Sequence, residues 1–139
     1  MDTDNLNELQ VFARTLDGEA ANQGYDGQCA VANVIMKRVA LKWKGDTDAR
    51  SVCLHHMQFS CWNGTNDSNP DRKRIMDPQE ETTATYNQCA GIAGLAIAGE
   101  LPDLTNGADS YEVTYSGAYW AAGLTPSAVI GKHSFYVTV

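Results

Sequence analysis

The sequence predicts an α+β domain that is mainly helical and carries a small, irregular β part towards its carboxyl end. Apolar residues recur at helical spacing over 6–19, an apolar segment covers 28–42, and a third helical pattern begins at Asp77-Pro78. Beyond Gly99 and Pro102 the chain changes to turn-rich stretches and short alternating segments. With 139 residues, 43% of them apolar, a single domain over 1–139 with a sizeable core is expected.

The first predicted helix, 6–19, places a carboxylate at the edge of an apolar stripe. The stripe consists of residues at helical spacing, namely Leu9, Phe12, Ala13, Leu16 and Ala20. Glu19 follows Leu16 by three residues and therefore lies beside the stripe. Partial burial disfavours the charged form of a carboxyl group, and a protonated carboxylic acid is the proton donor that glycosidic bond cleavage requires. The alternative is a solvated Glu at a frayed helix end beside Gly18.

The middle of the chain predicts a buried central helix followed by shorter elements. A polar break at 22–27 precedes the segment 28–42, which is apolar almost all round and is therefore expected to be covered by its neighbours. A charged stretch at 42–50 leads into a short helical piece at 51–56. Residues 58–62 partly alternate and predict a short strand or extended loop, and 63–69 predict an exposed polar loop.

The last predicted helix has a clear start signal. Asp77 suits the N-cap, Pro78 the first helical position and Glu80 the third. One face of this helix carries small and apolar residues suited to close packing on the central helix, namely Tyr86, Cys89, Ala90, Ala93 and Ile97. The helix is expected to end at Gly99 and Pro102, with β-type segments at 111–119 and 134–139.

Composition and charge restrict the partners. The formal net charge of -7 disfavours nucleic acid and anionic membranes, whereas an uncharged stretch of glycan remains compatible. The longest apolar run, 89–98, is too short to span a membrane, and the first residues show no signal-peptide pattern. We therefore expect synthesis in the cytoplasm without membrane insertion, and action outside it only with help from another protein.

The cysteines and histidines do not predict a metal site. Cys53 and Cys61 flank a loop and can be bridged in an oxidising compartment, but together with His55 and His56 they match no zinc spacing. No metal and no cofactor are expected. A nucleophilic pair of a cysteine with His133 is disfavoured, because nothing near Cys29 in the sequence would lower its thiol pKa.

Polar and aromatic residues outside the long helices form the candidate substrate site. Aromatic faces with amide and hydroxyl groups suit a pyranose ring, which stacks through its C–H face and hydrogen-bonds through its substituents. Any one of these aromatic residues could instead belong to the core. The candidates are Gln58, Phe59, Ser60, Trp62, Asn106, Tyr111, Trp120, His133 and Tyr136.

Three segments of the chain resemble the SleB-like cell wall hydrolases of spore cortex lysis and bacteriophages. The first runs from Ala13 through Gly18-Glu19-Ala20 to 35, and the second contains 52–53 and Gln58-Phe59-Ser60-Cys61-Trp62. The third contains 103–108, Tyr111, Trp120-Ala121 and then 130–136. The resemblance covers about 9–136.

This resemblance implies a lysozyme-like fold and cleavage of the peptidoglycan bond between N-acetylmuramic acid and N-acetylglucosamine. Glu19 aligns with the family's single acid/base. In a lytic transglycosylase the C6 hydroxyl of muramic acid attacks its own anomeric carbon and leaves a 1,6-anhydro end. Two alternatives remain open: hydrolysis by water, with Asp26, Asp103 or Asp109 as a second carboxylate, and a non-catalytic wall-binding module.

The resemblance also implies where the protein works. Peptidoglycan glycan strands are the expected partner, and a phage endolysin or virion-associated lysin with holin-dependent access to the wall is the expected role. Two departures from the family pattern bear on the mechanism. Asp17 replaces an aromatic residue and places a second carboxylate near Glu19 in the sequence, and Gln23 stands where a second Glu is common, which favours the one-carboxylate mechanism.

Overall fold

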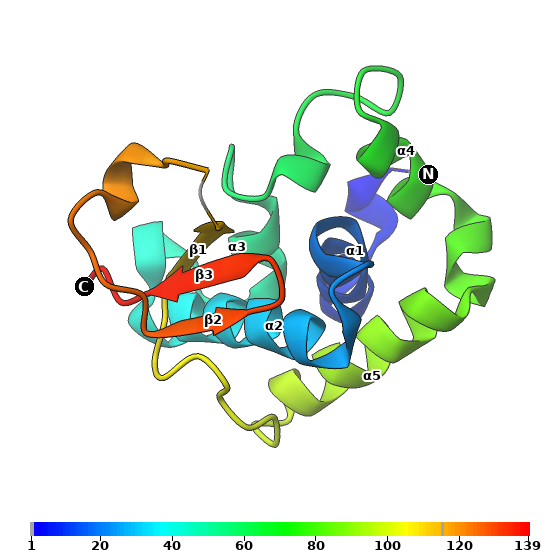
Figure 1. Cartoon of the computed structure of the whole chain (residues 1–139). Helices are drawn as coiled ribbons and strands as arrows, with labels where there is room; N and C mark the ends of the chain where they lie inside the picture. Colours follow the sequence, from blue (N-terminus) through cyan, green and yellow to red (C-terminus); the bar gives the residue numbers. More distant parts are fainter. Residues whose placement is uncertain (1, 115) are drawn as a thin grey trace.

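The computed structural model describes residues 2–114 and 116–139. Figure 1 shows a group of helices with a small sheet on one side. The main elements are α1 (Glu8–Ala20), α2 (Gly24–Leu41), α3 (Ala49–Leu54), α4 (Pro70–Met76), α5 (Ala84–Ile97), β1 (Ser110–Val113), β2 (Ala128–Ile130) and β3 (His133–Tyr136). Short 3-10 turns connect them, namely η1 (Thr3–Asn5), η2 (Trp43–Gly45), η3 (Ser60–Trp62), η4 (Pro78–Thr82) and η5 (Tyr119–Ala121).

Helix α1 is enclosed by the other helices. It begins with a capping box between Asn7 and Gln10, and it packs against α2, α3, α4 and α5. Residues 11–17 are buried without interruption, so α1 is more central than its amphipathic pattern predicted. Leu9 is 40% exposed, contrary to the prediction, because it lies in the first turn, and Val11 is buried instead.

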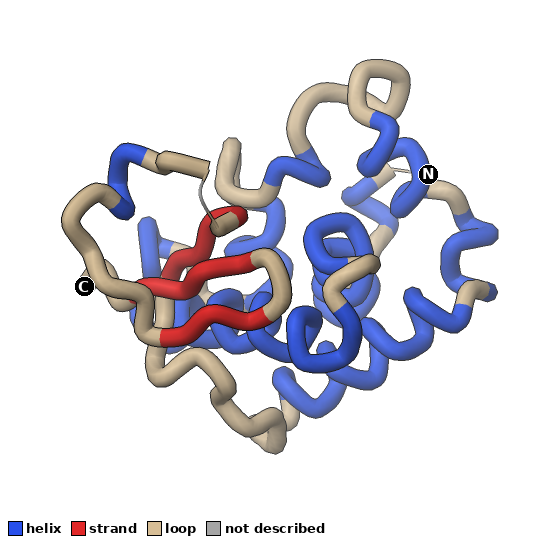
Figure 2. Tube along the Cα trace, viewed as in Figure 1, coloured by secondary structure: helices blue, strands red, loops and turns tan. Residues whose placement is uncertain are grey.

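Helix α2 is buried as predicted, but it begins earlier than expected. Residues 27–35 are all buried, and the helix starts at Gly24. The polar residues 24–27 therefore form its first turn and not a break. Figure 2 shows α2 passing between the other helices and the sheet, and it contacts both β1 and β2. Helix α2 is thus the element that joins the helical part to the β part.

The segments between α2 and α5 show where local signals were misread. Residues 58–62 were predicted as strand or extended loop, but they contain η3, a 3-10 turn. Helix α4 was not predicted, although Asn69 caps it and Pro70 occupies its first turn. The helix expected from Asp77-Pro78 is interrupted: η4 follows Asp77, and a second cap at Thr83 begins α5.

Helix α5 packs against α1 and α2 through its small residues. Tyr86, Cys89 and Ala93 are buried as the predicted face required, whereas Ile97 is 41% exposed and Ala96 faces the core instead. The short helix predicted at 51–56 is α3, two residues earlier at both ends. Among the described residues, none of the helices combines the length and the hydropathy needed to span a membrane.

The sheet is antiparallel, with strand order β1-β3-β2. Strand β1 covers only the beginning of the β segment predicted at 111–119, since it ends at Val113 and Tyr119 belongs to η5, and β3 covers the first part of the segment predicted at 134–139. Strand β2 was not predicted because three residues carry little pattern. Tyr111 pairs with Phe135, and Phe135 pairs with Ala128. This face packs on Ala30 and Val34 of α2, so the sheet is anchored to the helical part by one apolar face.

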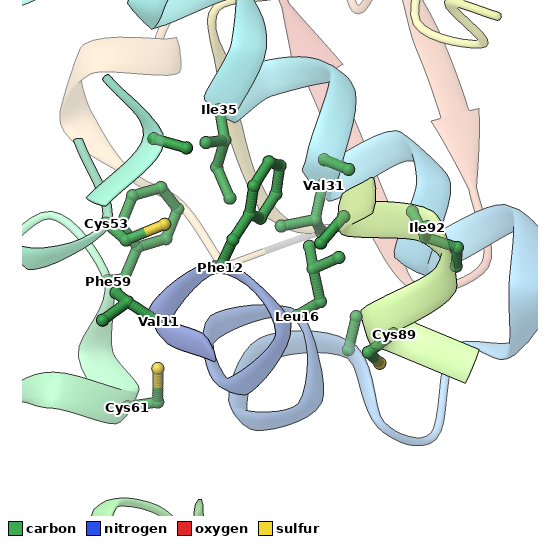
Figure 3. Close-up of a cluster of buried hydrophobic side chains, with 14 of the residues drawn as sticks. Val11, Phe12, Leu16, Val31, Ile35, Cys53, Phe59, Cys61, Cys89 and Ile92 are labelled. Carbon is green, nitrogen blue, oxygen red and sulfur yellow. The ribbon is translucent and has the colours of Figure 1, made fainter. Parts of the chain in front are cut away.

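The main core lies between α1, α2, α3, η3 and α5. Figure 3 shows Phe12 and Leu16 of α1 among side chains of the other elements, with Phe59 close to Cys53. All four cysteines are buried free thiols. Burial raises the thiol pKa of Cys53 and of Cys89 to about 12, so neither can supply a thiolate near neutral pH. These cysteines are packing residues.

Candidate active site

Glu19, the last but one residue of α1, is held by donors from two distant segments. Its Oε1 accepts a hydrogen bond of 2.6 Å from the hydroxyl of Tyr111 in β1, 92 residues away along the chain. Its Oε2 accepts from the backbone N–H of Cys61 at 3.1 Å and from the hydroxyl of Ser60 at 3.2 Å. The carboxyl group therefore lies where α1, η3 and the sheet meet, and its orientation is fixed from both sides.

Gly18 allows η3 to approach the last turn of α1. A Cβ at this position would lie 2.6 Å from the Cβ and 2.9 Å from the Sγ of Cys61, closer than atoms can pack. It would also lie 3.2 Å from Cδ1 of Ile75. Because Cys61 supplies the backbone donor to Glu19, the absence of a side chain at Gly18 is a condition for the geometry of the carboxyl group.

Tyr111 is held by three neighbouring rings. Its ring centroid lies 4.9 Å from that of His133, 5.7 Å from Phe135 and 6.5 Å from Phe59. Burial, followed by the negative charge of Glu19, raises the pKa of Tyr111 well above its usual value. The phenol therefore keeps its proton and acts as a donor to Glu19.

His133 is a buried, neutral neighbour of this cluster. Burial lowers its pKa and outweighs the opposing effect of Glu19, so the imidazole is uncharged near neutral pH. Its Nδ1 is buried and has no hydrogen-bond partner among residues 2–114 and 116–139. His133 thus packs its aromatic ring against Tyr111, and its Nδ1 is not used in hydrogen bonding.

A groove of about 440 Å³ adjoins Tyr111 on the side away from the core. Gln58 and Trp120, two of the predicted substrate residues, line it together with Tyr111. The structure therefore brings six predicted residues to Glu19 or to the adjoining groove. They are Gln58, Phe59, Ser60, Tyr111, Trp120 and His133.

Three other predicted substrate residues lie away from Glu19. Trp62 is buried, and its indole N–H donates to the Thr15 hydroxyl at 2.8 Å. The Asn106 amide donates to the Ser127 carbonyl at 3.0 Å and so fixes a loop. Tyr136 follows Phe135 in β3, so it points to the outer face of the sheet, where its ring meets Trp120 edge-on at 5.4 Å.

Asp17 does not reinforce Glu19. Two residues apart on a helix, the two side chains point in different directions. Asp17 Oδ1 accepts from Nη1 of Arg74 at 2.8 Å, and the same nitrogen donates to Oε2 of Glu80 at 2.6 Å. Asp17 therefore belongs to a buried ion network that fixes α4 on α1.

The candidate second carboxylates already have structural partners. Asp103 accepts from the backbone N–H groups of Thr105 and Gly107. Asp109 accepts from Thr138 and from the backbone N–H of Val139. These hydrogen bonds lower the pKa of both carboxyl groups. Asp26 is exposed in the first turn of α2.

Sequence reasoning did not place Arg38 or Gln23 among the site residues. Arg38 lines the groove, lies 3.7 Å above the Trp43 ring, and donates from Nε to the Asp109 carbonyl at 2.8 Å. The signal available in the sequence was the position of Arg38, a charged residue within the apolar segment 28–42. Gln23 Oε1 accepts from the Lys132 backbone N–H at 2.9 Å and so attaches the β2–β3 turn to the start of α2.

The described residues contain no cluster of three or more His, Cys, Asp or Glu side chains that could hold a metal ion. The two histidines considered above for a zinc site have different surroundings. His55 Nδ1 lies 2.7 Å from Oδ2 of Asp46, whereas His56 is exposed. The chemistry that this arrangement offers is therefore that of one oriented carboxyl group with a phenol, a hydroxyl and a backbone N–H around it.

Comparison with known proteins gives two matches. A family model described as Cell Wall Hydrolase matches residues 22–136. The catalytic domain of the germination-specific lytic transglycosylase SleB from Bacillus anthracis has a similar structure, with a TM-score of 0.70, 24% sequence identity and 95% of each chain covered. No curated protein sequence gives a significant match. The structural similarity confirms the predicted mainly helical α+β, lysozyme-like fold, and the family match shows that this chain belongs to the cell wall hydrolase family.

Proposed function

We propose that this protein is a peptidoglycan lytic transglycosylase in which Glu19 is the single acid/base. The observation that carries the proposal is the triple anchoring of the Glu19 carboxyl group by Tyr111, Ser60 and Cys61. Within the described residues, no hydrogen bond or ion pair connects Glu19 with another carboxylate. The family match begins after Glu19, at residue 22, so the assignment of this residue rests on the resemblance of 13–35 and on the geometry.

The two oxygens of Glu19 have different surroundings. Oε1 receives the short hydrogen bond from Tyr111 within the ring cluster, whereas Oε2 is on the side of Ser60, which is exposed. We assign proton transfer to Oε2, since it lies on the side of the exposed Ser60. Tyr111 and the Cys61 N–H then keep the carboxyl group in place while its protonation state changes.

The proposed reaction has two proton transfers. Protonated Glu19 donates its proton to the bridging oxygen as the bond to C1 of muramic acid breaks, which leaves a hydroxyl on the departing sugar and positive charge at C1. The Glu19 carboxylate then accepts the proton of the C6 hydroxyl, whose oxygen bonds to C1. The product is a 1,6-anhydro ring, and Glu19 is protonated again. No water and no second carboxylate enter this sequence.

The groove beside Tyr111 is proposed to hold the sugars next to the scissile bond. Trp120 and Tyr111 offer rings for stacking, and Gln58 offers a polar contact. Trp62, Asn106 and Tyr136 are proposed to support the walls of the site, since their side chains bond or pack to other protein groups. The single domain over 1–139 stays a prediction.

Mass spectrometry of the soluble products from purified peptidoglycan tests the proposal. The wild type should release fragments that end in 1,6-anhydro-muramic acid, and Glu19→Gln should release none, because its amide cannot donate a proton and take it back. Reducing muramic acid ends that disappear in Glu19→Gln would contradict the transglycosylase and indicate hydrolysis. Wall binding without any product from the wild type would indicate a binding module.

The matched control for this experiment is Asp17→Asn. Asp17 is a second carboxylate of the same helix, but it is bonded to Arg74 and not to the site. If Glu19 is the acid/base, Asp17→Asn should lower the stability of the protein but release the same products as the wild type. A role as a phage endolysin or virion-associated lysin stays a prediction, which co-expression with and without a holin would test by host lysis.

A further inference from the structure

The groove beside Tyr111 has a charge opposite to that of the whole chain. The protein carries a net charge of -7, yet the groove is lined by Arg38 and Lys44 and by no carboxylate side chain among the described residues. Asp46 shares a small adjoining cavity with both cations, but its Oδ2 is bonded to His55 at 2.7 Å. The groove is therefore a local cationic site that begins next to the group holding Glu19.

Arg38 is held rigidly at the base of this groove. Its guanidinium lies 3.7 Å above the Trp43 ring, its Nε donates to the Asp109 carbonyl at 2.8 Å, and its Nη1 donates to Oε1 of Gln58 at 3.3 Å. Because these contacts fix the plane of the group, little side-chain entropy is lost when it binds a further acceptor. A rigid arginine at the base of a groove is typical of carboxylate recognition.

One edge of the Arg38 guanidinium has no protein partner. Its Nε and Nη1 donate hydrogen bonds, whereas Nη2 makes no hydrogen bond to any described residue and is not completely shielded from solvent, although Arg38 as a whole is only 7% exposed. Burial lowers the pKa of Arg38 only to about 10, so the group remains charged near neutral pH. The Nη2 edge is thus a charged donor available to a ligand in the groove.

Lys44 and Met57 also line the groove. Lys44 is exposed, and its Nζ lies 5.7 Å from the centre of the Trp43 ring. Both residues have positive backbone φ angles, 56° for Lys44 and 64° for Met57. Residues other than glycine adopt such angles only at an energetic cost. The backbone on this side is thus bent into an uncommon conformation where it lines the groove.

We propose that this groove is a subsite for the carboxylates of the stem peptide attached to muramic acid. The inference rests on the proposed function, since it takes the glycan strand as substrate. In such a strand the sugar rings suit Trp120 and Tyr111, and the anionic groups are carboxylates, which suit Arg38 and Lys44. The enzyme should therefore prefer strands that carry peptides with free carboxylates to strands without them.

Initial rates on three substrates test the subsite. They are glycan strands with intact peptides, the same strands with carboxylates converted to neutral amides, and strands stripped of peptides, which keep the lactyl carboxylate of muramic acid. The wild type should lose about tenfold in kcat/KM on the amidated strands, through KM and not through kcat. Stripped strands should be equally poor, because the carboxylates that bind the groove belong to the peptide.

Two variants and a control identify the groove. Lys44→Ala should lose about two- to threefold, and Arg38→Lys about tenfold, in kcat/KM on intact strands, with no loss on amidated strands. Lys44 is exposed, so its variant tests the idea even if the Arg38 variant folds poorly. Lys73→Ala removes the same charge from an exposed position on α4 that does not line this groove, and it should match the wild type on all three substrates.

The outcomes separate the subsite from the proposed function. Equal losses on intact and amidated strands, or no loss in either variant, would overturn the subsite while cleavage itself continued. The wild type could instead prefer stripped strands to amidated ones, and Lys44→Ala could remove this preference. That result would assign the groove to the lactyl carboxylate and would also overturn the peptide proposal. A wild type that cleaves none of the substrates would instead contradict the proposed function.

Discussion

The contact between Gly18 and η3 gives a prediction whose sign and size follow from the structure. In Gly18→Ala the new methyl group would lie 2.6 Å from Cβ and 2.9 Å from Sγ of Cys61. The Cβ of Cys61 is attached to the backbone and cannot rotate away, so η3 has to move away from α1. That movement withdraws the Cys61 N–H and the Ser60 hydroxyl from Glu19, to which they now donate at 3.1 and 3.2 Å.

The expected loss of stability is the difference between two effects. Replacing glycine by alanine within a helix is favourable by about 0.5–1 kcal/mol, and forcing an extra methyl group into a packed core costs about 1–3 kcal/mol. A contact of 2.6 Å places the cost near the upper end of that range, so Gly18→Ala should destabilise the protein by about 1–2 kcal/mol, or lower Tm by about 3–7 °C. A misplacement of the carboxyl group by about 1 Å should reduce kcat by about 100-fold.

Matched controls are available in α5. Gly91 and Gly94 are also helical, but a Cβ at either position meets no other group within 4 Å. Gly91→Ala and Gly94→Ala should each stabilise the protein by about 0.5–1 kcal/mol without changing kcat. Urea denaturation and turnover of purified peptidoglycan are the measurements.

A double variant tests the cause. Cys61→Gly removes the two closest atoms that the new methyl group would meet, so Gly18→Ala combined with Cys61→Gly should recover part of the kcat lost by Gly18→Ala alone. If Gly18→Ala behaves like the two α5 controls, the close packing of η3 on α1 does not position Glu19, and the reasoning is refuted.

Two further variants test the ring cluster and the buried ion network. Tyr111→Phe keeps the packing but removes the 2.6 Å donor to Glu19, so kcat should fall about 10- to 100-fold with KM nearly unchanged, and a large rise in KM would contradict a positioning role. Glu80 should make stability fall as pH rises, because the neighbouring Asp17 carboxylate, to which protonated Glu80 can donate, and burial raise the pKa of Glu80 from 4.5 to about 7 in the folded state. The folded state binds this proton more tightly than the unfolded chain does, so the stabilisation is complete below pH 4.5 and is lost as the pH rises through about 7. Glu80→Gln carries a permanent donor for Oδ2 of Asp17, which is buried without a partner, and its urea midpoint should vary less over this range; an unchanged pH profile would contradict the assignment.

Local signals predicted the elements well where a helix is determined by residues close in the sequence. The central helix, the short helix before η3 and the face of α5 all follow from periodicity and caps. The same signals were present but unused at Asn69-Pro70, which begins α4. Strand β2 has only three residues, and its pairing with β3 decides its conformation, so its own pattern could not reveal it.

The candidate site shows what periodicity cannot supply. The position of Glu19 at the edge of an apolar stripe was visible in the sequence, but its partners lie 41, 42 and 92 residues away. Trp62 and Tyr136 have the same residue types as a sugar site requires, yet the fold uses both for packing. Residue type alone does not distinguish an aromatic wall from an aromatic core residue.

The sequence by itself determined the fold class, the order of the long helices and the carboxyl group at the end of the first of them. These depend on contacts within about one helical turn, which capping residues and periodicity record directly. Only the tertiary structure decided which groups surround that carboxyl group and where the cationic groove lies. The groove beside Tyr111 is formed by α2, η2, the loop before η3, β1, η5 and the residue Thr138 after β3. Segments so far apart in the sequence come together only when the chain packs.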